Sequence, residues 1–131
     1  MAKTYYLTVR QLEKLGACPP GLERFKAAFG SRLALTPENA MRVAESGFRF
    51  AADIHWLARV TLDTPRYRAY HRAVDAASDA YLLKVGGMSR DERQSDEGRA
   101  REAKAHRERV ESVALALCWH LFRQRKEAGR G

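Results

Sequence analysis

The sequence has only two cysteines, Cys18 and Cys118, which lie a hundred residues apart. So few thiols argue against the disulfide framework that stabilises many small secreted domains. Neither cysteine belongs to a CxxC pair or to another spacing typical of metal ligands. We expect both to be free thiols, buried as small apolar side chains, and a Cys18–Cys118 disulfide is the less favoured alternative.

The sequence also lacks a long hydrophobic segment. Its longest continuous apolar run, residues 113–119, has seven residues, whereas a membrane-spanning helix needs about 20. No segment resembles a signal peptide, so we expect a protein of the cytoplasm. The apolar content of 45% over 131 residues is enough for one folded domain with a real core.

Acidic residues are in the minority, with 16 Asp and Glu against 24 Lys and Arg and a net charge of +8. This balance excludes a mimic of DNA, which requires an acidic face. A basic surface attracts nucleic acid, acidic protein surfaces or anionic lipid. Many basic domains bind none of these, so the charge alone does not identify a partner.

No motif of catalysis or cofactor binding is present. The chain has no HExxH, no GxSxG, no phosphate-binding loop and no dinucleotide fingerprint. No two of the four histidines stand at the spacing that brings ligands together on a helix. Cys18 precedes a predicted helix start, where a reactive thiol is conceivable, but packing explains it better. We therefore expect no catalytic residue, no cofactor and no metal, and a protein that is not an enzyme.

Apolar residues recur at helical spacing along the whole chain, and no segment alternates as a long strand does. The fold class we predict is all-α, a compact bundle of about six helices with a long C-terminal helix. Proline and threonine signals mark helix starts near residues 8, 19, 36 and 64, and a fourth helix is expected over 51–62, with Phe48 and Phe50 buried at its entrance. Residues 5–9 and 32–35 are candidate short extended pieces.

A single domain, 1–131, is expected, and it divides into four parts. An N-terminal helical module covers 1–85, a polar loop covers 86–98, the C-terminal helix covers 99–126, and a basic tail covers 127–131. Ser89 with Glu92 fits a capping box, so the last helix could instead begin there. Its first half has alanine as its only apolar residue, which predicts that it projects from the core or is marginally ordered.

The best candidate for partner binding is a cluster of arginines on the fifth predicted helix and just before it. The cluster consists of Arg59, Arg66, Arg68 and Arg72. Arginine pairs bidentately with phosphate or carboxylate, and the interleaved Tyr67 and Tyr70 could stack on a ligand. The alternative, slightly favoured for the tyrosines, makes them core anchors behind a solvated arginine face.

A second basic segment, residues 99–109, and the basic residues from 123 onward are weaker candidates. Glu102, Glu108 and Glu111 stand three or four residues from basic ones, so a solvated helix laced with ion pairs is the preferred interpretation over a phosphate track. The terminal cluster could add non-specific affinity for phosphate. Apolar residues near Trp119 and Phe122 leave a homodimer open.

The first half of the chain resembles a module common in small helical proteins of bacteriophages and mobile elements. The resemblance rests on Leu7-Thr8-x-x-Gln11-Leu12, Gly16-Ala17-Cys18, Leu22-x-x-Phe25, Phe29-Gly30, Leu35 to Ala40 and Trp56-Leu57-Ala58. Most such proteins have no assigned role, and some small phage proteins of this general kind inhibit host defence, anti-CRISPR proteins included. The resemblance implies a non-enzymatic inhibitor that occludes a host CRISPR–Cas effector or nuclease, with guide RNA or DNA as further partners. The alternative is a basic nucleic-acid-binding regulator.

Overall fold

The computed structural model describes residues 4–45 and 53–129. Its elements follow the order β1 (Tyr6–Thr8), α1 (Val9–Lys14), α2 (Pro19–Phe29), β2 (Arg32–Ala34), α3 (Pro37–Glu45), α4 (His55–Thr61), α5 (Thr64–Val85), α6 (Arg90–Gln94) and α7 (Asp96–Ala128). The described residues thus form seven helices, against about six predicted, and the all-α class with a long C-terminal helix is confirmed. The predicted burial of Phe48 and Phe50 and the first residues of the fourth predicted helix lie outside the described residues.

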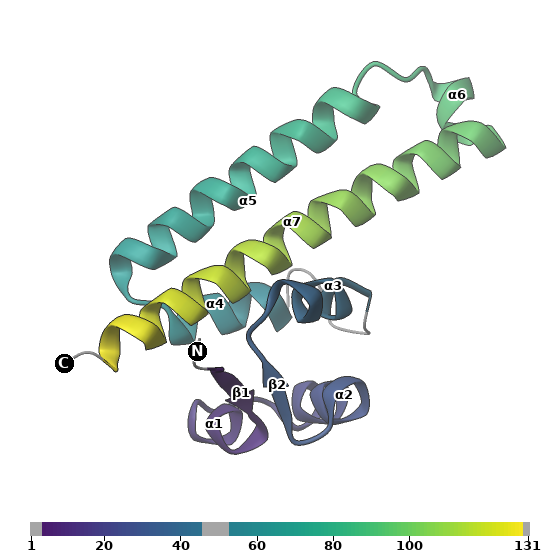
Figure 1. The fold of residues 1–131 in the computed structure, drawn as a ribbon. Helices are drawn as coiled ribbons and strands as arrows, with labels where there is room; N and C mark the ends of the chain where they lie inside the picture. Colours follow the sequence, from purple (N-terminus) through teal and green to yellow (C-terminus); the bar gives the residue numbers. More distant parts are fainter. Residues whose placement is uncertain (1–3, 46–52, 130–131) are drawn as a thin grey trace.

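Two long helices dominate the molecule (Figure 1). α5 and α7 run side by side in opposite directions, and α6 joins them at one end. The C-terminal half of α7 packs on α3 and covers a small N-terminal module, whereas its N-terminal half extends beyond that module. The end of α5, α6 and the first part of α7 together form this extension. We call it, residues 78–109, the arm. The prediction that the start of the C-terminal helix projects from the core is confirmed.

The N-terminal module is built around a two-stranded antiparallel ladder. β1 pairs with β2 so that Leu7 stands opposite Leu33, and both are buried. These strands coincide with the two extended pieces predicted from the sequence. The predicted capping box of α1 is also present, because the Gln11 amide donates to the Thr8 hydroxyl while the Thr8 amide donates to the Gln11 side chain. Gly16 follows α1 with φ of +84°, a conformation that glycine adopts without strain.

One continuous core joins the module to the long helices. Its fully buried side chains come from five elements or their flanks, and the largest are Leu7, Phe25, Ile54, Tyr70 and Val113. Burying a side chain of this size contributes roughly 1.5–3 kcal/mol. The N-terminal module and α4 therefore depend on α5 and α7 for burial of their apolar faces.

A separate, smaller cluster holds the arm together. Val85, Met88 and Ala105 are buried there, and Tyr81 packs against them. The Tyr81 hydroxyl donates to Glu102 at 3.1 Å, so contacts between α5 and α7 continue beyond the main core. The arm is thus a helical hairpin with its own small apolar centre.

The structure corrects the predicted polar loop over 86–98. α6 occupies part of it, and α7 begins at Asp96, three residues before the predicted start. The reason is a pair of serine caps: the Ser89 hydroxyl accepts from the Glu92 amide, and the Ser95 hydroxyl accepts from the Gly98 amide. Gly98, the last residue of the predicted loop, lies in the first turn of α7.

Two further boundaries differ from the prediction. Asp63, not Thr64, caps α5, because its carboxylate accepts from the Arg66 amide at 3.0 Å and its backbone is extended. Thr64 and Pro65 then occupy the first two helical positions. α7 continues to Ala128, so within the described residues the end of the predicted C-terminal helix and the start of the predicted basic tail form one helix.

Candidate interaction surface

The structure separates the four predicted arginines into two groups. Arg66 has only 18% of its side chain exposed and forms an ion pair with Glu127 at the end of α7. A second carboxylate, that of Asp63, lies 3.9 Å away. These carboxylates raise the pKa of Arg66 further, with the Glu127 hydrogen bond as the largest cause. Arg66 therefore joins the start of α5 to the end of α7 and is not available to a partner.

The other three arginines are exposed. Arg59 on α4 and Arg68 and Arg72 on α5 have no hydrogen-bond or ion-pair partner within the described residues. Arg68 and Arg72 are one turn apart and share a helix face, whereas Arg66 and Arg68, two residues apart, point about 200° apart. The predicted site thus loses one member and keeps three cations that a partner can reach.

The tyrosines between these arginines are core anchors, as the favoured alternative predicted. Tyr70 is fully buried, and its hydroxyl lies 2.7 Å from Nδ1 of His55 on α4. Burial raises the pKa of Tyr70 well above its ordinary value. Tyr67 is half-buried and packs edge-on against His71, with ring centroids 4.7 Å apart. Neither tyrosine offers a fully open ring for stacking.

His55 of α4 and His71 of α5 form a stacked pair at the junction of the two helices. The rings of His55 and His71 are parallel within 2°, with centroids 6.4 Å apart. Burial lowers the pKa of His55, and the neighbouring charge of His71 adds to the effect. Both effects favour the neutral form of His55. No group of three or more His, Cys, Asp or Glu that could hold a metal occurs within the described residues.

The most open aromatic side chain in the described part of the chain is Trp119 on α7. It is 56% exposed, and Leu115, one turn earlier, is 43% exposed. Beside them lies a hollow of about 250 Å³, whose walls include Pro37 of α3 and Phe122 of α7. Exposed apolar side chains that gather beside such a hollow are a feature of contact sites.

Cations border this apolar area. The guanidinium of Arg123 lies 5.6 Å from the centroid of the Trp119 ring, and the ammonium of Lys126 lies 6.0 Å from that of Phe122. His120 follows Trp119 on α7, and its pKa is lowered mainly by burial and then by the charges of Arg66 and Arg72. We call Leu115, Trp119, Phe122 and Arg123 the Trp119 surface.

Not all of the predicted terminal cations face solvent. Arg125 turns inward, where it donates to the Tyr6 carbonyl and, at 2.9 Å, to the Gln11 side chain. Burial lowers the pKa of Arg125. This arginine fastens α7 to the N-terminal ladder, so it does not belong to a phosphate-binding tail.

The two cysteines are both free, but only one is buried. Cys118 lies in the core, where burial raises the pKa of its thiol to about 12. Cys18 is exposed, which corrects the expectation of two buried thiols. It lines a hollow of about 240 Å³ together with Arg24 and Asp53, which pair through two hydrogen bonds of 2.8 and 2.5 Å. The hollow is largely apolar, because its other walls include Leu12, Phe25 and Trp56.

Comparisons with protein-family models, curated proteins and solved structures find no match to this chain. Within the described residues, no helix is both long and apolar enough to cross a bilayer. The functional argument therefore rests on the surfaces described above. The sequence identified Arg59, Arg68 and Arg72, and it noted Trp119 only as a candidate dimer contact. The exposure of this residue beside a hollow could be read only from the packing of α7 on α3.

Proposed function

We propose that the protein acts by binding, not by catalysis, as a phage or mobile-element inhibitor of a host defence complex. The observation that supports binding is Trp119, more than half exposed beside an apolar hollow and bordered by cations. The kind of target, a CRISPR–Cas effector or nuclease in the host cytoplasm, rests on the resemblance of the first half of the chain.

Trp119 has the character of an interface anchor. Tryptophan and arginine are the residue types most enriched among the side chains that dominate binding energy, and they act within patches that exclude water. Trp119 lies between Leu115 and Arg123, and the hollow beside it has room for an apolar side chain of a partner. A partner that covers this area would gain apolar burial and shield the neighbouring cations from solvent.

The charge of the protein favours an acidic protein partner. Arg59, Arg68 and Arg72 carry no ion pair within the described residues, and the whole chain has a net charge of +8. Complementary charge accelerates encounter and fixes orientation. A second copy of the chain would bring the same positive charge, so a homodimer through this surface is disfavoured by repulsion. Occlusion of an acidic working surface on the target is the mechanism we favour.

The test measures protection of a targeted phage. The protein is expressed in a host whose CRISPR–Cas system cuts that phage, and plating efficiency is compared for the wild type, Trp119→Ala, and Arg68→Glu with Arg72→Glu. We expect the wild type to restore plating and both variants to lose most of that effect. The matched control is Leu83→Ala, which removes a leucine 86% exposed on the arm and should act as the wild type. Arg66 is left unchanged, because its loss would disturb the fold.

Purification of the tagged protein from the same host, with and without nuclease, separates the alternatives. If a CRISPR–Cas effector co-purifies in stoichiometric amount after nuclease treatment, and does not co-purify with the Trp119→Ala variant, the inhibitor proposal is supported. If co-purification of partners disappears after nuclease treatment, the basic nucleic-acid-binding regulator is supported instead. If the wild-type protein protects the phage against none of the CRISPR–Cas types tested, the choice of target is overturned.

A further inference from the structure

The N-terminal half of α7 carries a basic face that its own carboxylates do not neutralise. Arg99, Lys104 and Arg107 are exposed, and none forms an ion pair within the described residues. The residues outside the described ranges contain no aspartate or glutamate that could pair with them. The expectation of a helix laced with ion pairs is therefore wrong for these three cations.

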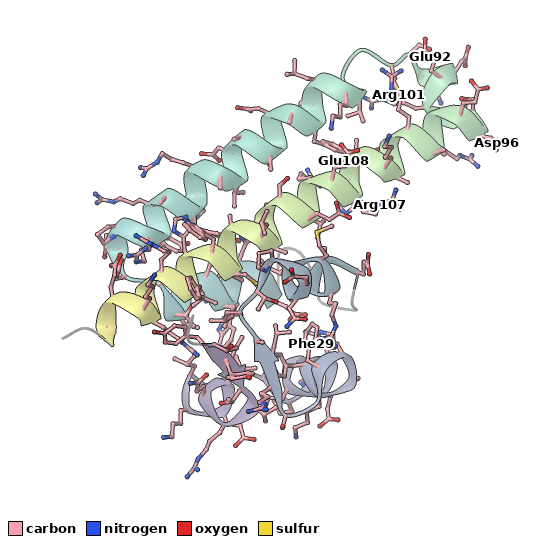
Figure 2. The ribbon with its side chains drawn as sticks, in the orientation of Figure 1. Phe29, Glu92, Asp96, Arg101, Arg107 and Glu108 are labelled. Atoms are coloured by element: carbon pink, nitrogen blue, oxygen red, sulfur yellow. The ribbon has the colours of Figure 1, made fainter. Side chains whose placement is uncertain are left out.

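The reason is that the carboxylates of this segment turn towards α5. Glu102 accepts from the Tyr81 hydroxyl at 3.1 Å, and Glu108 pairs with Lys84 of α5. Lys84 is also the largest cause of the lowered pKa of Glu108, ahead of Lys104 and Arg107. In Figure 2, Glu108 lies on the side of α7 that faces α5, and Arg107 lies on the opposite side. Glu102 and Glu108 thus contact α5, and neither forms an ion pair with Arg99, Lys104 or Arg107 within the described residues.

The three cations fall on one sector of the helix. At 100° per residue, residues 99, 100, 103, 104 and 107 lie within about 140° of the helix circumference. Between the cations stand Ala100 and Ala103, both exposed. Alanine is short enough to let a ligand approach the helix closely. We call these five residues the α7 basic face.

We propose that the α7 basic face binds the phosphate backbone of double-stranded nucleic acid. From residue 99 to residue 107 the helix rises about 12 Å, which is comparable with the roughly 12 Å width of the DNA major groove. Cations at the two ends can therefore contact phosphates on opposite walls of the groove. In this geometry Arg99, Lys104 and Arg107 all contact phosphates, and Ala100 and Ala103 have no polar side chain to read base edges, so the binding is independent of sequence.

Two carboxylates limit the face. Asp96 lies one turn before Arg99, and Glu111 lies one turn after Arg107. Like-charge repulsion would keep phosphates from binding beyond Arg99 and Arg107. The footprint is consequently short, with about three phosphate contacts. This activity is independent of the Trp119 surface, which lies on the other half of α7.

The test is fluorescence anisotropy with a labelled 24-base-pair DNA duplex of arbitrary sequence, titrated at salt concentrations from 50 to 200 mM. The variant carries Arg99→Gln, Lys104→Gln and Arg107→Gln. The control carries Arg10→Gln, Lys14→Gln and Lys26→Gln, three exposed changes in α1 and α2 that lower the net charge equally. Circular dichroism checks that both remain folded.

We expect the variant to lose at least tenfold in affinity at 100 mM salt, and the slope of log K against log salt to become shallower by roughly 2.7, or 0.9 for each lost phosphate contact. The control should lose less than threefold. Equal losses in variant and control, or no binding of the duplex by the wild type at 50 mM salt, would overturn the proposal. Trp119→Ala should bind the duplex as the wild type does, so failure here and failure of the inhibitor proposal are distinguishable.

Discussion

Replacement of Gly98 by alanine should destabilise the protein, although helix propensity predicts the opposite. Gly98 lies in the first turn of α7, and alanine is normally favoured over glycine inside a helix by about 1 kcal/mol. A Cβ built at this position would lie 1.6 Å from the Glu92 carbonyl oxygen and 2.6 Å from its carbon. Both are backbone atoms of α6, so no side-chain rotation can relieve the overlap.

The magnitude follows from what holds α6 against α7. α6 has no buried residue, so moving it away mainly breaks hydrogen bonds. The Ser95 hydroxyl donates to the Glu92 carbonyl at 2.6 Å, and the Ser95 amide donates to the Asp91 carbonyl at 3.1 Å. Two such bonds are together worth about 1–3 kcal/mol. After the gain of about 1 kcal/mol in helix propensity, we expect a net loss of up to about 2 kcal/mol.

Urea unfolding followed by circular dichroism measures the change in the free energy of unfolding. Hydrogen exchange locates it, and protection should fall first in α6 and at the start of α7. The matched control is Gly87→Ala, because a Cβ there would meet no heavy atom within 4 Å. A Gly98→Ala protein more stable than the wild type would refute the close approach of α6 to α7.

Three further outcomes are expected. Arg66→Gln should lower the free energy of unfolding by about 0.5–1 kcal/mol, because its ion pair with the last turn of α7 is partly solvated, and urea unfolding at low and high salt would measure the loss. A thiol reagent should modify Cys18 at once and Cys118 only on unfolding, as mass spectrometry of the native and denatured protein would reveal. Folded-state pKa values of His55 and His120 are lowered, so the unfolded chain binds more protons and stability should fall as the pH drops below about 6.5. Thermal melts from pH 7.5 to 5 would follow this loss, which should shrink when both histidines are replaced by glutamine.

Sequence reasoning predicted elements whose signals are local. The capping box of α1, the proline at the start of α3 and the length of α5 each depend on residues within one or two turns, so they could be predicted without tertiary information. The short ladder was indicated only as two extended pieces, because strand pairing is a contact between distant segments. The predicted loop over 86–98 was wrong at Gly98, since a glycine required for close packing has the same composition signal as a glycine in a loop.

The candidate site was predictable only in part, for the same reason. Helical spacing predicts the direction in which a side chain points from its own helix, but it does not predict which other element packs against that side chain. Arg66 forms an ion pair with a carboxylate sixty-one residues away, and Arg125 donates to the N-terminal ladder. Neither arginine is therefore available to a partner. Arg68 and Arg72 meet no such partner within the described residues, and their predicted exposure is confirmed.

The inward contact of Arg125 also sets an order of events during synthesis. The arginine reaches the Tyr6 carbonyl across 119 residues of sequence. At roughly 5–20 residues per second, the ribosome makes Arg125 about 6–24 s after Tyr6. During this interval the N-terminal ladder and α2 can pair locally, but Leu7 and Phe25 lack the α7 side of their core. The nascent chain therefore exposes apolar surface until its last helix is complete, and a stalled or truncated chain would be a substrate for chaperones and proteases.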